Sequence, residues 1–168
     1  MSMEYTALAT LKTWLQTAMD ATPETNLTAS QIVIGYPDQD KMPYPVMLYI
    51  VPEGGQWQRT TTENIEEQFS LKLYFMVKQS ATHTSMTAQV QAVFEYFGAF
   101  ANAMNYDGTC GHAFDDSAIN SWDFYPAVEG MTNTVGLDVS ITLLFERDPI
   151  ILPGDSVVPS PDLTPFGG

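Results

Sequence analysis

The sequence predicts an α+β domain: a mostly antiparallel sheet of about four to five strands, two helices packed on one face of it, and an extended C-terminal tail. Three observations lead to this prediction. Two segments carry apolar residues at helical spacing, two long segments alternate between apolar and polar residues, and several predicted strands follow one another without an intervening helix. Strands joined without crossover helices pair mostly antiparallel, so the predicted element order is α-β-β-β-α-β-β.

The first helix is predicted near the N-terminus by an apolar stripe at helical spacing, with polar residues on the other faces. It ends before Pro23, because proline cannot continue a helix. The stripe consists of Leu8, Leu11, Leu15, Ala18 and Met19.

The segment that follows predicts two strands and two irregular connections. Residues 31–35 (QIVIG) predict a short strand, and the proline-containing residues 36–45 predict an irregular excursion. The uninterrupted apolar run at 46–51 (VMLYIV) predicts a strand buried on both faces. The polar, glycine-containing residues 53–64 (EGGQWQRTTTEN) predict a projecting hairpin connection.

Residues 65–78 give the clearest strand pattern. Their odd-numbered positions are apolar except for Glu67, which interrupts the pattern near the strand's start, where we expect the margin of the sheet. Strict alternation over this length predicts one face against a core and one face against water or a partner.

After residue 84 the apolar residues recur at helical spacing, which predicts a second helix. We expect this helix to lie across the sheet and to supply most of the aromatic packing. Ser85 or Thr84 is placed to cap its start. Two more strands follow, one within 119–130 and one within 131–147. The helical stripe consists of Met86, Val90, Val93, Phe94, Phe97, Ala101 and Met104, and the first of the two strands carries Trp122 and Phe124.

The domain organisation predicted is a single α+β domain at residues 1–147 and a proline-rich, extended C-terminal arm at 148–168. A chain of 168 residues is long enough for one domain with a substantial core, and no internal linker divides it. The composition of the arm does not support independent folding. We therefore expect the arm to lie along a neighbouring subunit or another partner, held by its apolar residues.

The charge balance argues against two classes of partner. The net charge is −14 at pH 7, from 20 acidic and six scattered basic residues. Nucleic-acid binding needs clustered Lys and Arg, and an anionic membrane surface repels an acidic chain. Charged residues make up only 15% of the chain, which suits large protein contacts, whose cores are depleted of charge, and equally an ordinary soluble domain with a Thr-rich exterior.

The single Cys110 gives neither an intramolecular disulfide nor a zinc framework, which suits a reducing cytoplasm. The N-terminus lacks the features of a signal peptide, and no run approaches the roughly 20 apolar residues that span a bilayer. We expect a soluble protein made in the cytoplasm.

The segment 106–120 collects reactive residue types. Cys110 and His112 are two residues apart, whereas catalytic Cys–His partners usually come from distant parts of a fold. Asp38 and Asp40 form a D-x-D pair without the further oxygens and the glycine of a calcium loop. Both patterns favour turns, so we predict no catalytic residue, no cofactor and no metal site.

The chain has a leading amphipathic helix, then QIVIGYPDQDKMPYPVMLYIVPEGG, the alternating EEQFSLKLYFMVK, one central aromatic helix and a closing β pair ending in SITLLFERD. This combination resembles the tail terminator (tail-completion) family of long-tailed bacteriophages, and the resemblance covers about residues 5–148. Related head–tail connector proteins share the same residue patterns. The C-terminal arm is not part of the resemblance.

Membership of this family would imply a structural virion protein of the tail and neck, not an enzyme. Its copies would form a homohexameric ring that caps the tail tube protein and docks to head–tail connector proteins. DNA would pass through the lumen without specific binding, and an acidic lumen would let it slide.

The candidate partner contacts are two residues of the projecting connection and five of the arm. Three alternatives stay open: another phage neck or baseplate subunit, a small cytoplasmic enzyme that uses the loop of Cys110, His112 and Asp115, and a small-ligand-binding α+β domain. The candidate contact residues are Trp57, Arg59, Ile150, Ile151, Leu152, Leu163 and Phe166.

Overall fold

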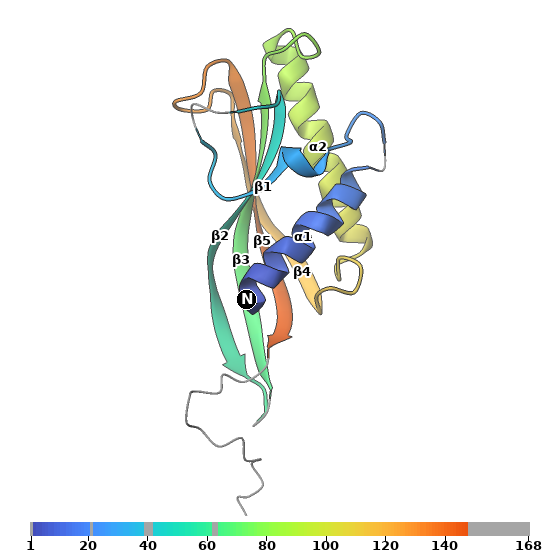
Figure 1. Ribbon diagram of the computed structural model, residues 1–168, viewed down its shortest axis with the longest axis vertical. Coiled ribbons are helices and arrows are strands. Elements are labelled where there is room, and N and C mark those ends of the chain that lie inside the picture. Colours follow the sequence, from blue (N-terminus) through green and yellow to red (C-terminus); the bar gives the residue numbers. More distant parts are fainter. Residues whose placement is uncertain (1, 21, 39–41, 62–63, 148–168) are drawn as a thin grey trace, which may run out of the picture.

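The computed structural model describes residues 2–20, 22–38, 42–61 and 64–147 (Figure 1). These residues form two α-helices and a five-stranded mixed sheet, in the predicted order, which confirms the α+β class. The elements are α1 (Met3–Met19), a 3-10 turn η1 (Ala29–Gln31), β1 (Ile32–Ile34), β2 (Val46–Arg59), β3 (Ile65–Lys78), α2 (Met86–Tyr106), β4 (Asp116–Tyr125) and β5 (Thr134–Arg147).

The strand order in the sheet is β1-β2-β3-β5-β4. The pairing is antiparallel throughout, except that β1 runs parallel to β2. Both helices lie on the same side of the sheet, as predicted (Figure 1). The main core fills the space between these helices and the odd-numbered side chains of β3 and β5.

Serine side chains cap both helices. The Ser2 hydroxyl accepts a hydrogen bond from the Tyr5 amide (3.1 Å), and the Ser85 hydroxyl accepts one from the Ala88 amide (3.2 Å). Each bond satisfies one of the amides that a helix start leaves without an intrahelical partner. The predicted cap of α2 at Ser85 is thus confirmed, as is the end of α1 before Pro23.

The buried side of α2 differs from the predicted stripe. Val93 and Met104 lie in the core as expected, but Met86 and Phe94 are exposed. Apolar residues cover so much of this helix that polarity alone does not fix which side faces the sheet. The buried positions are Gln89, Ala92, Val93, Tyr96, Phe100 and Met104.

Gln89 is buried on α2 because its amide has specific partners. Its Nε2 donates to the carbonyl oxygen of Val77 (3.0 Å), near the end of β3, and to that of Asn133 (2.8 Å), the last residue of the loop before β5. A buried amide with both donors satisfied costs little, and here it fixes the rotation of α2 over the sheet.

The run Val46–Val51 is buried on both faces, as predicted. Its even-numbered residues belong to the main core. Its odd-numbered residues belong to a second cluster on the side of the sheet that faces away from the helices. That cluster consists of Met47, Tyr49, Val51 and Met76, with Val33, Met42, Tyr74, Val128 and Met131 packed against it.

The predicted loop at 53–64 is wrong over most of its length, because β2 continues to Arg59. A bulge at Glu53 lets the strand resume its pairing: Pro52 lies opposite Leu71 and Gly54 opposite Ser70. Gly54 has a φ of 145°, which favours glycine. Pairing with the long β3 outweighs the low strand propensity of the Glu-Gly-Gly sequence.

Candidate interaction surfaces

Among the described residues, the side of the sheet that faces away from the helices is covered only toward the end where β1 lies, by the second cluster. Farther along the strands, toward Arg59, the even-numbered side chains of β3 and β5 are exposed or half-buried, and all of them except Leu144 are polar. No helix among the described residues contacts this part of the sheet (Figure 1). We call it the open face; its central residues are Gln68, Ser70, Lys72, Ser140 and Thr142.

A charged cluster from three strands lies at the border of the open face. Asp138 is only 2% exposed; its Oδ2 lies 3.7 Å from Lys72 Nζ and accepts a hydrogen bond from the Tyr125 hydroxyl at 2.8 Å. Its Oδ1 is buried and has no hydrogen-bond partner among the described residues. Burial alone would lower the pKa of Lys72, but the surrounding negative groups, Asp138 first, raise it above its ordinary value. Lys72 therefore remains a cation beside Asp138.

Tyr125 makes a pH-dependent contribution to stability. Its hydrogen bond to Asp138, with burial and nearby negative charge, raises its pKa from 10.0 to about 12. Because the folded state holds this proton more tightly, the contribution is complete below pH 10 and is lost as pH rises from about 10 to about 12. We expect Tyr125→Phe to flatten the fall in the free energy of unfolding across this window, measured by urea denaturation. The exposed Tyr106 supplies the control Tyr106→Phe, and equal slopes in both variants would contradict the assignment.

Trp57 and Arg59 lie together at the end of β2, on a strand and not in a loop. The bulge at Glu53 shifts the alternation, so that these residues pair with Glu67 and Ile65 on the helix side of the sheet. Arg59 is exposed, and Trp57 is 54% exposed at an end of the sheet that extends past the N-terminus of α1 (Figure 1). Their role as partner contacts stays a prediction.

Glu67 lies near the end of the sheet, as expected, and its side chain is buried there. A Cβ atom on Gly55 would lie 3.3 Å from Glu67 Oε1. The glycine opposite β3 thus leaves room for this carboxylate beside Trp57.

Four aromatic rings form a second exposed surface, where β4 meets α2. A bulge between Ile119 and Ser121 turns Trp122 and Phe124 toward α2, on the same side as Ile119. Trp122 is 48% exposed and Phe94 is 36% exposed. We call this surface the aromatic patch; its ring centroids are 5.8 Å apart for Phe94–Trp122, 5.7 Å for Phe97–Trp122 and 5.5 Å for Phe94–Phe124.

The aromatic patch was missed in the sequence analysis, which placed Trp122 and Phe124 on a strand without a surface. The one available signal is the change of parity from Ile119 to Trp122, since both side chains lie on one face only if a residue is bulged between them.

The loop between α2 and β4 is a tight turn organised by Asp107. The Asp107 carboxylate accepts hydrogen bonds from the Thr109 hydroxyl (2.6 Å), the Thr109 amide (3.0 Å) and the Gly111 amide (2.6 Å). These bonds, led by the one from the Thr109 hydroxyl, lower the pKa of Asp107. Cys110, Gly111 and His112 all have positive φ values (50°, 74° and 67°). The Asp and Gly residues here make a turn, as the sequence analysis favoured.

The reactive residue types of this loop lie in different environments. Cys110 is 2% exposed within the main core, whereas His112 is exposed. His83 precedes α2 and His112 follows it, so a 21-residue helix, about 30 Å long, lies between them. In the part of the chain that the structure describes, no three His, Cys, Asp or Glu side chains are grouped to hold a metal ion.

Cys110 is expected to resist thiol reagents in the folded protein. Burial raises its pKa to about 11, which at about pH 8 leaves about 100-fold less thiolate than a pKa of 9.0 would. We expect a thiol reagent to modify Cys110 at least about 100-fold more slowly in the folded protein than in urea-unfolded protein. Mass spectrometry of samples taken over time measures both rates. Ser121→Cys, which places a second thiol on the exposed β4, should react fast at its new position; equal rates at both positions would contradict the burial of Cys110.

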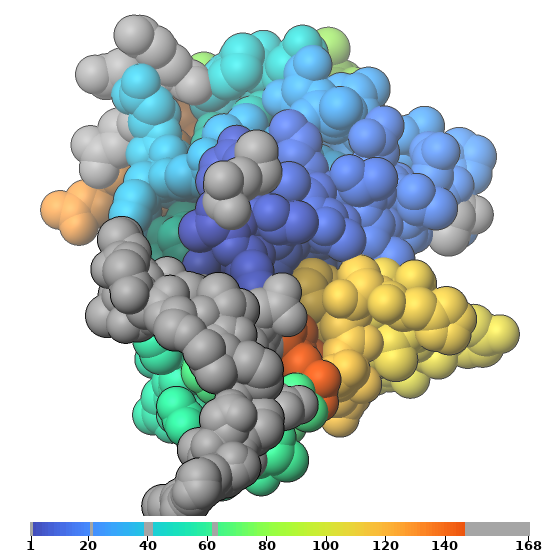
Figure 2. All heavy atoms as spheres, turned by 60° about the horizontal axis from the view of Figure 1, so that its bottom comes forward, coloured from blue at the N-terminus to red at the C-terminus, as the bar shows by residue number. Residues whose placement is uncertain are grey.

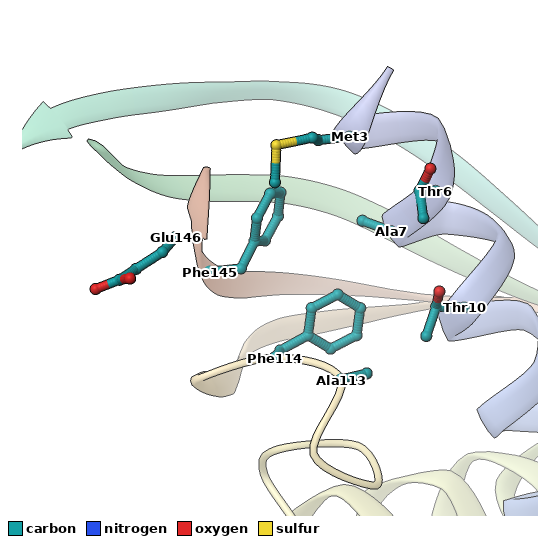
Figure 3. Close-up of a pocket in the computed structure, with 8 residues that line it drawn as sticks. All are labelled: Met3, Thr6, Ala7, Thr10, Ala113, Phe114, Phe145 and Glu146. Carbon is teal, nitrogen blue, oxygen red and sulfur yellow. The ribbon is translucent and has the colours of Figure 1, made fainter. Parts of the chain in front are cut away.

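A shallow pocket of about 200 Å³ lies where α1, the loop before β4 and the end of β5 meet (Figure 3). Figure 2 shows the end of β5 between α1 and the loop after α2. The rings of Phe114 and Phe145 line it, while Glu146 points away from it (Figure 3). It lacks the convergent polar groups that a substrate site needs.

Five of the predicted contact residues lie outside the described residues, as does the arm at 148–168. These are Ile150, Ile151, Leu152, Leu163 and Phe166; Asp40 of the D-x-D pair also lies outside.

Of the helices in the described residues, neither is long and apolar enough to cross a membrane. In comparisons with known proteins, no protein-family model matches the chain, and no curated protein matches its sequence. What the protein does is therefore inferred from its own residues and surfaces.

Proposed function

We propose that the protein is a structural subunit of a bacteriophage tail, which assembles into a ring that terminates the tail tube and joins it to the head connector. The sequence resemblance to tail terminators suggests this class. The observation that carries the proposal is a pair of different exposed surfaces toward opposite edges of the sheet: Trp57 at the end of β2, and the aromatic patch at β4.

Two different surfaces toward opposite edges of the sheet suit head-to-tail association. When one surface of a subunit binds the other surface of the next, the assembly closes into a ring if the rotation permits. Tryptophan is among the residues that contribute most to binding in protein interfaces. The open face, with its polar and uncharged Gln68, Ser70 and Thr142, offers a further surface for a neighbour or for the tail tube.

The alternative of a thiol enzyme has less support. A catalytic cysteine needs an accessible thiolate, and Cys110 is buried with a raised pKa. The adjacent His112 is exposed on a turn whose geometry Asp107 sets, so the loop has a sufficient structural role.

The proposal is tested by native mass spectrometry and negative-stain microscopy of the full chain, alone and with purified tail tubes. We expect closed rings of six that bind one end of a tube. Trp57→Ala and Trp122→Ala should reduce the ring population, whereas Tyr106→Ala, at a more exposed aromatic residue, should leave it unchanged. A chain that stays monomeric and joins no tube would overturn the proposal, and rings that ignore tubes would favour another neck or baseplate subunit.

A second candidate function, the binding of a small ligand, is favoured by one pocket. This pocket of about 350 Å³ lies beside the charged cluster, and Tyr74 and Tyr125 line it with Met76, Val128 and Leu137. A mostly apolar cavity with two hydroxyl groups suits a small aromatic or aliphatic alcohol or acid. Thermal-shift screening of such compounds should raise the melting temperature; no shift with any of them would remove this candidate.

A further inference from the structure

The β4 strand offers an edge to which another strand can be added. It is the last strand of the sheet, and within the described residues it pairs only with β5. The unpaired amides and carbonyls of an edge strand are a template for an added strand. After its bulge, β4 keeps an unbroken register with β5 from Ser121 to Tyr125.

The aromatic patch lies directly beside this edge. Trp122 belongs to β4 itself and contacts Phe94 and Phe97 of α2. A strand added along β4 would cover the exposed part of the Trp122 ring while its backbone paired with the strand. Exposed apolar patches of this kind mark interaction sites in soluble proteins.

The chain contains a segment whose sequence suits such an addition. The five prolines of the arm are all at odd-numbered positions: 149, 153, 159, 161 and 165. In an extended chain successive amides point to opposite sides, so the even-numbered side keeps every N–H donor. Proline is tolerated in an edge strand where its missing donor would face away from the sheet. Four even-numbered residues, Ile150, Leu152, Val158 and Phe166, also share one face of the extended arm.

The arm of the same copy would have to pass around the start of β4 to reach this edge. β5 ends at Arg147, but residues 113–115 lie between its end and the outer edge of β4. The Asp115 amide donates to the Leu144 carbonyl (2.8 Å), and the Phe114 ring lies 6.1 Å from that of Phe145. A 21-residue arm reaches up to about 70 Å when extended, which is enough to reach an adjacent subunit.

We propose that residues 148–168 of one copy add a strand to the β4 edge of a neighbouring copy, with the even-numbered amides facing β4. The inference rests on the proposed function only in requiring that copies of the chain associate. The arm carries three aspartates and no base, and β4 carries Asp116 and Asp123, so the contact is not driven by charge and strengthens with salt.

The test uses two full-length variants, one with Ser121→Cys on β4 and one with Ser156→Cys in the arm, mixed and treated with a short bis-maleimide crosslinker. Cys110 stays in place because it is buried. We expect a crosslink that joins Cys residues of different molecules, identified by mass spectrometry.

Two adjacent valines provide the matched comparison. Val158→Pro, introduced into the Ser156→Cys chain, removes a donor on the even side and should lower the crosslink yield by about tenfold. Val157→Pro removes a donor on the odd side and should leave the yield within about twofold. Val157→Ala and Val158→Ala separate the loss of the side chain from the loss of the amide.

Three results would overturn the inference: equal effects of the two prolines, crosslinking only when both cysteines are in one chain, or crosslinking to Gln56→Cys on β2 in place of Ser121→Cys. Rings that join tail tubes without the Ser121 crosslink would refute the arm contact and leave the proposed function standing. The predicted crosslink in a protein that ignores tubes would support the arm contact alone.

Discussion

Replacing Phe100 by alanine is expected to lower the free energy of unfolding by about 3–5 kcal/mol. The Phe100 side chain has no exposed surface and lies between α2 and the sheet, with its ring 5.9 Å from that of Phe75. Removing the ring leaves a cavity that the close-packed strands beneath it cannot fill without distortion. Urea denaturation followed by circular dichroism measures the change.

The matched control is Phe94→Ala on the same helix. Phe94 is 36% exposed and contacts only the aromatic patch, so we expect a loss of about 1–2 kcal/mol. The comparison also tests the rotation of α2, because the sequence pattern alone places Phe94 in the core. Equal losses in the two variants would contradict the rotation that Gln89 fixes.

Replacing Lys72 by methionine is expected to cost about 1–3 kcal/mol, because the buried Asp138 carboxylate then lacks a cation. Tyr125 still donates to Asp138, which limits the loss. Urea denaturation of the variant and of the unmodified protein measures this loss.

Two further variants make the second prediction specific. Lys78→Met, at an exposed position of the same strand, should change the free energy of unfolding by less than about 0.5 kcal/mol. The double variant Lys72→Met with Asp138→Leu should recover most of the loss, because apolar replacement of both partners removes the uncompensated charge. If the double variant is less stable than Lys72→Met alone, an uncompensated charge is not the source of the loss, and Asp138 stabilises the fold through its hydrogen bond from Tyr125 even without the cation.

The long, regular strands were the most predictable part of the fold. The alternation at 65–78 predicts β3 with its observed bounds, because one face of that central strand meets the core from Phe69 to Val77. The apolar run at 46–51 likewise predicts burial on both faces, since a second cluster covers its odd-numbered side chains.

The bulge in β2 and the rotation of α2 were not predictable from local pattern. The Glu-Gly-Gly sequence has the composition of a turn, and only the length of the paired β3 makes it part of a strand. The rotation of α2 depends on hydrogen bonds from Gln89 to two carbonyls distant in sequence. Both features are set by tertiary contacts, which a local periodicity does not contain.

The candidate surfaces were predictable only in part. The polar, glycine-containing segment around Trp57 and Arg59 predicts exposed side chains. Both residues are exposed in the structure, and they lie two positions apart on β2, on the same side of the sheet. The aromatic patch was missed because Phe94 was assigned to the core and the bulge before Trp122 was not recognised. The interpretation of 107–115 as a turn needed only its Asp and Gly residues.

The two bulged residues, Glu53 and Asn120, give this molecule a simple route to evolutionary change. Each bulge absorbs one extra residue, so deleting either one would leave a regular ladder in which Trp57 still lies opposite Glu67 and Trp122 opposite Val139. The central strands β3 and β5 would keep their own alternation. A single-codon deletion can therefore shorten an outer strand without moving either tryptophan to the other side of the sheet or redesigning the interior.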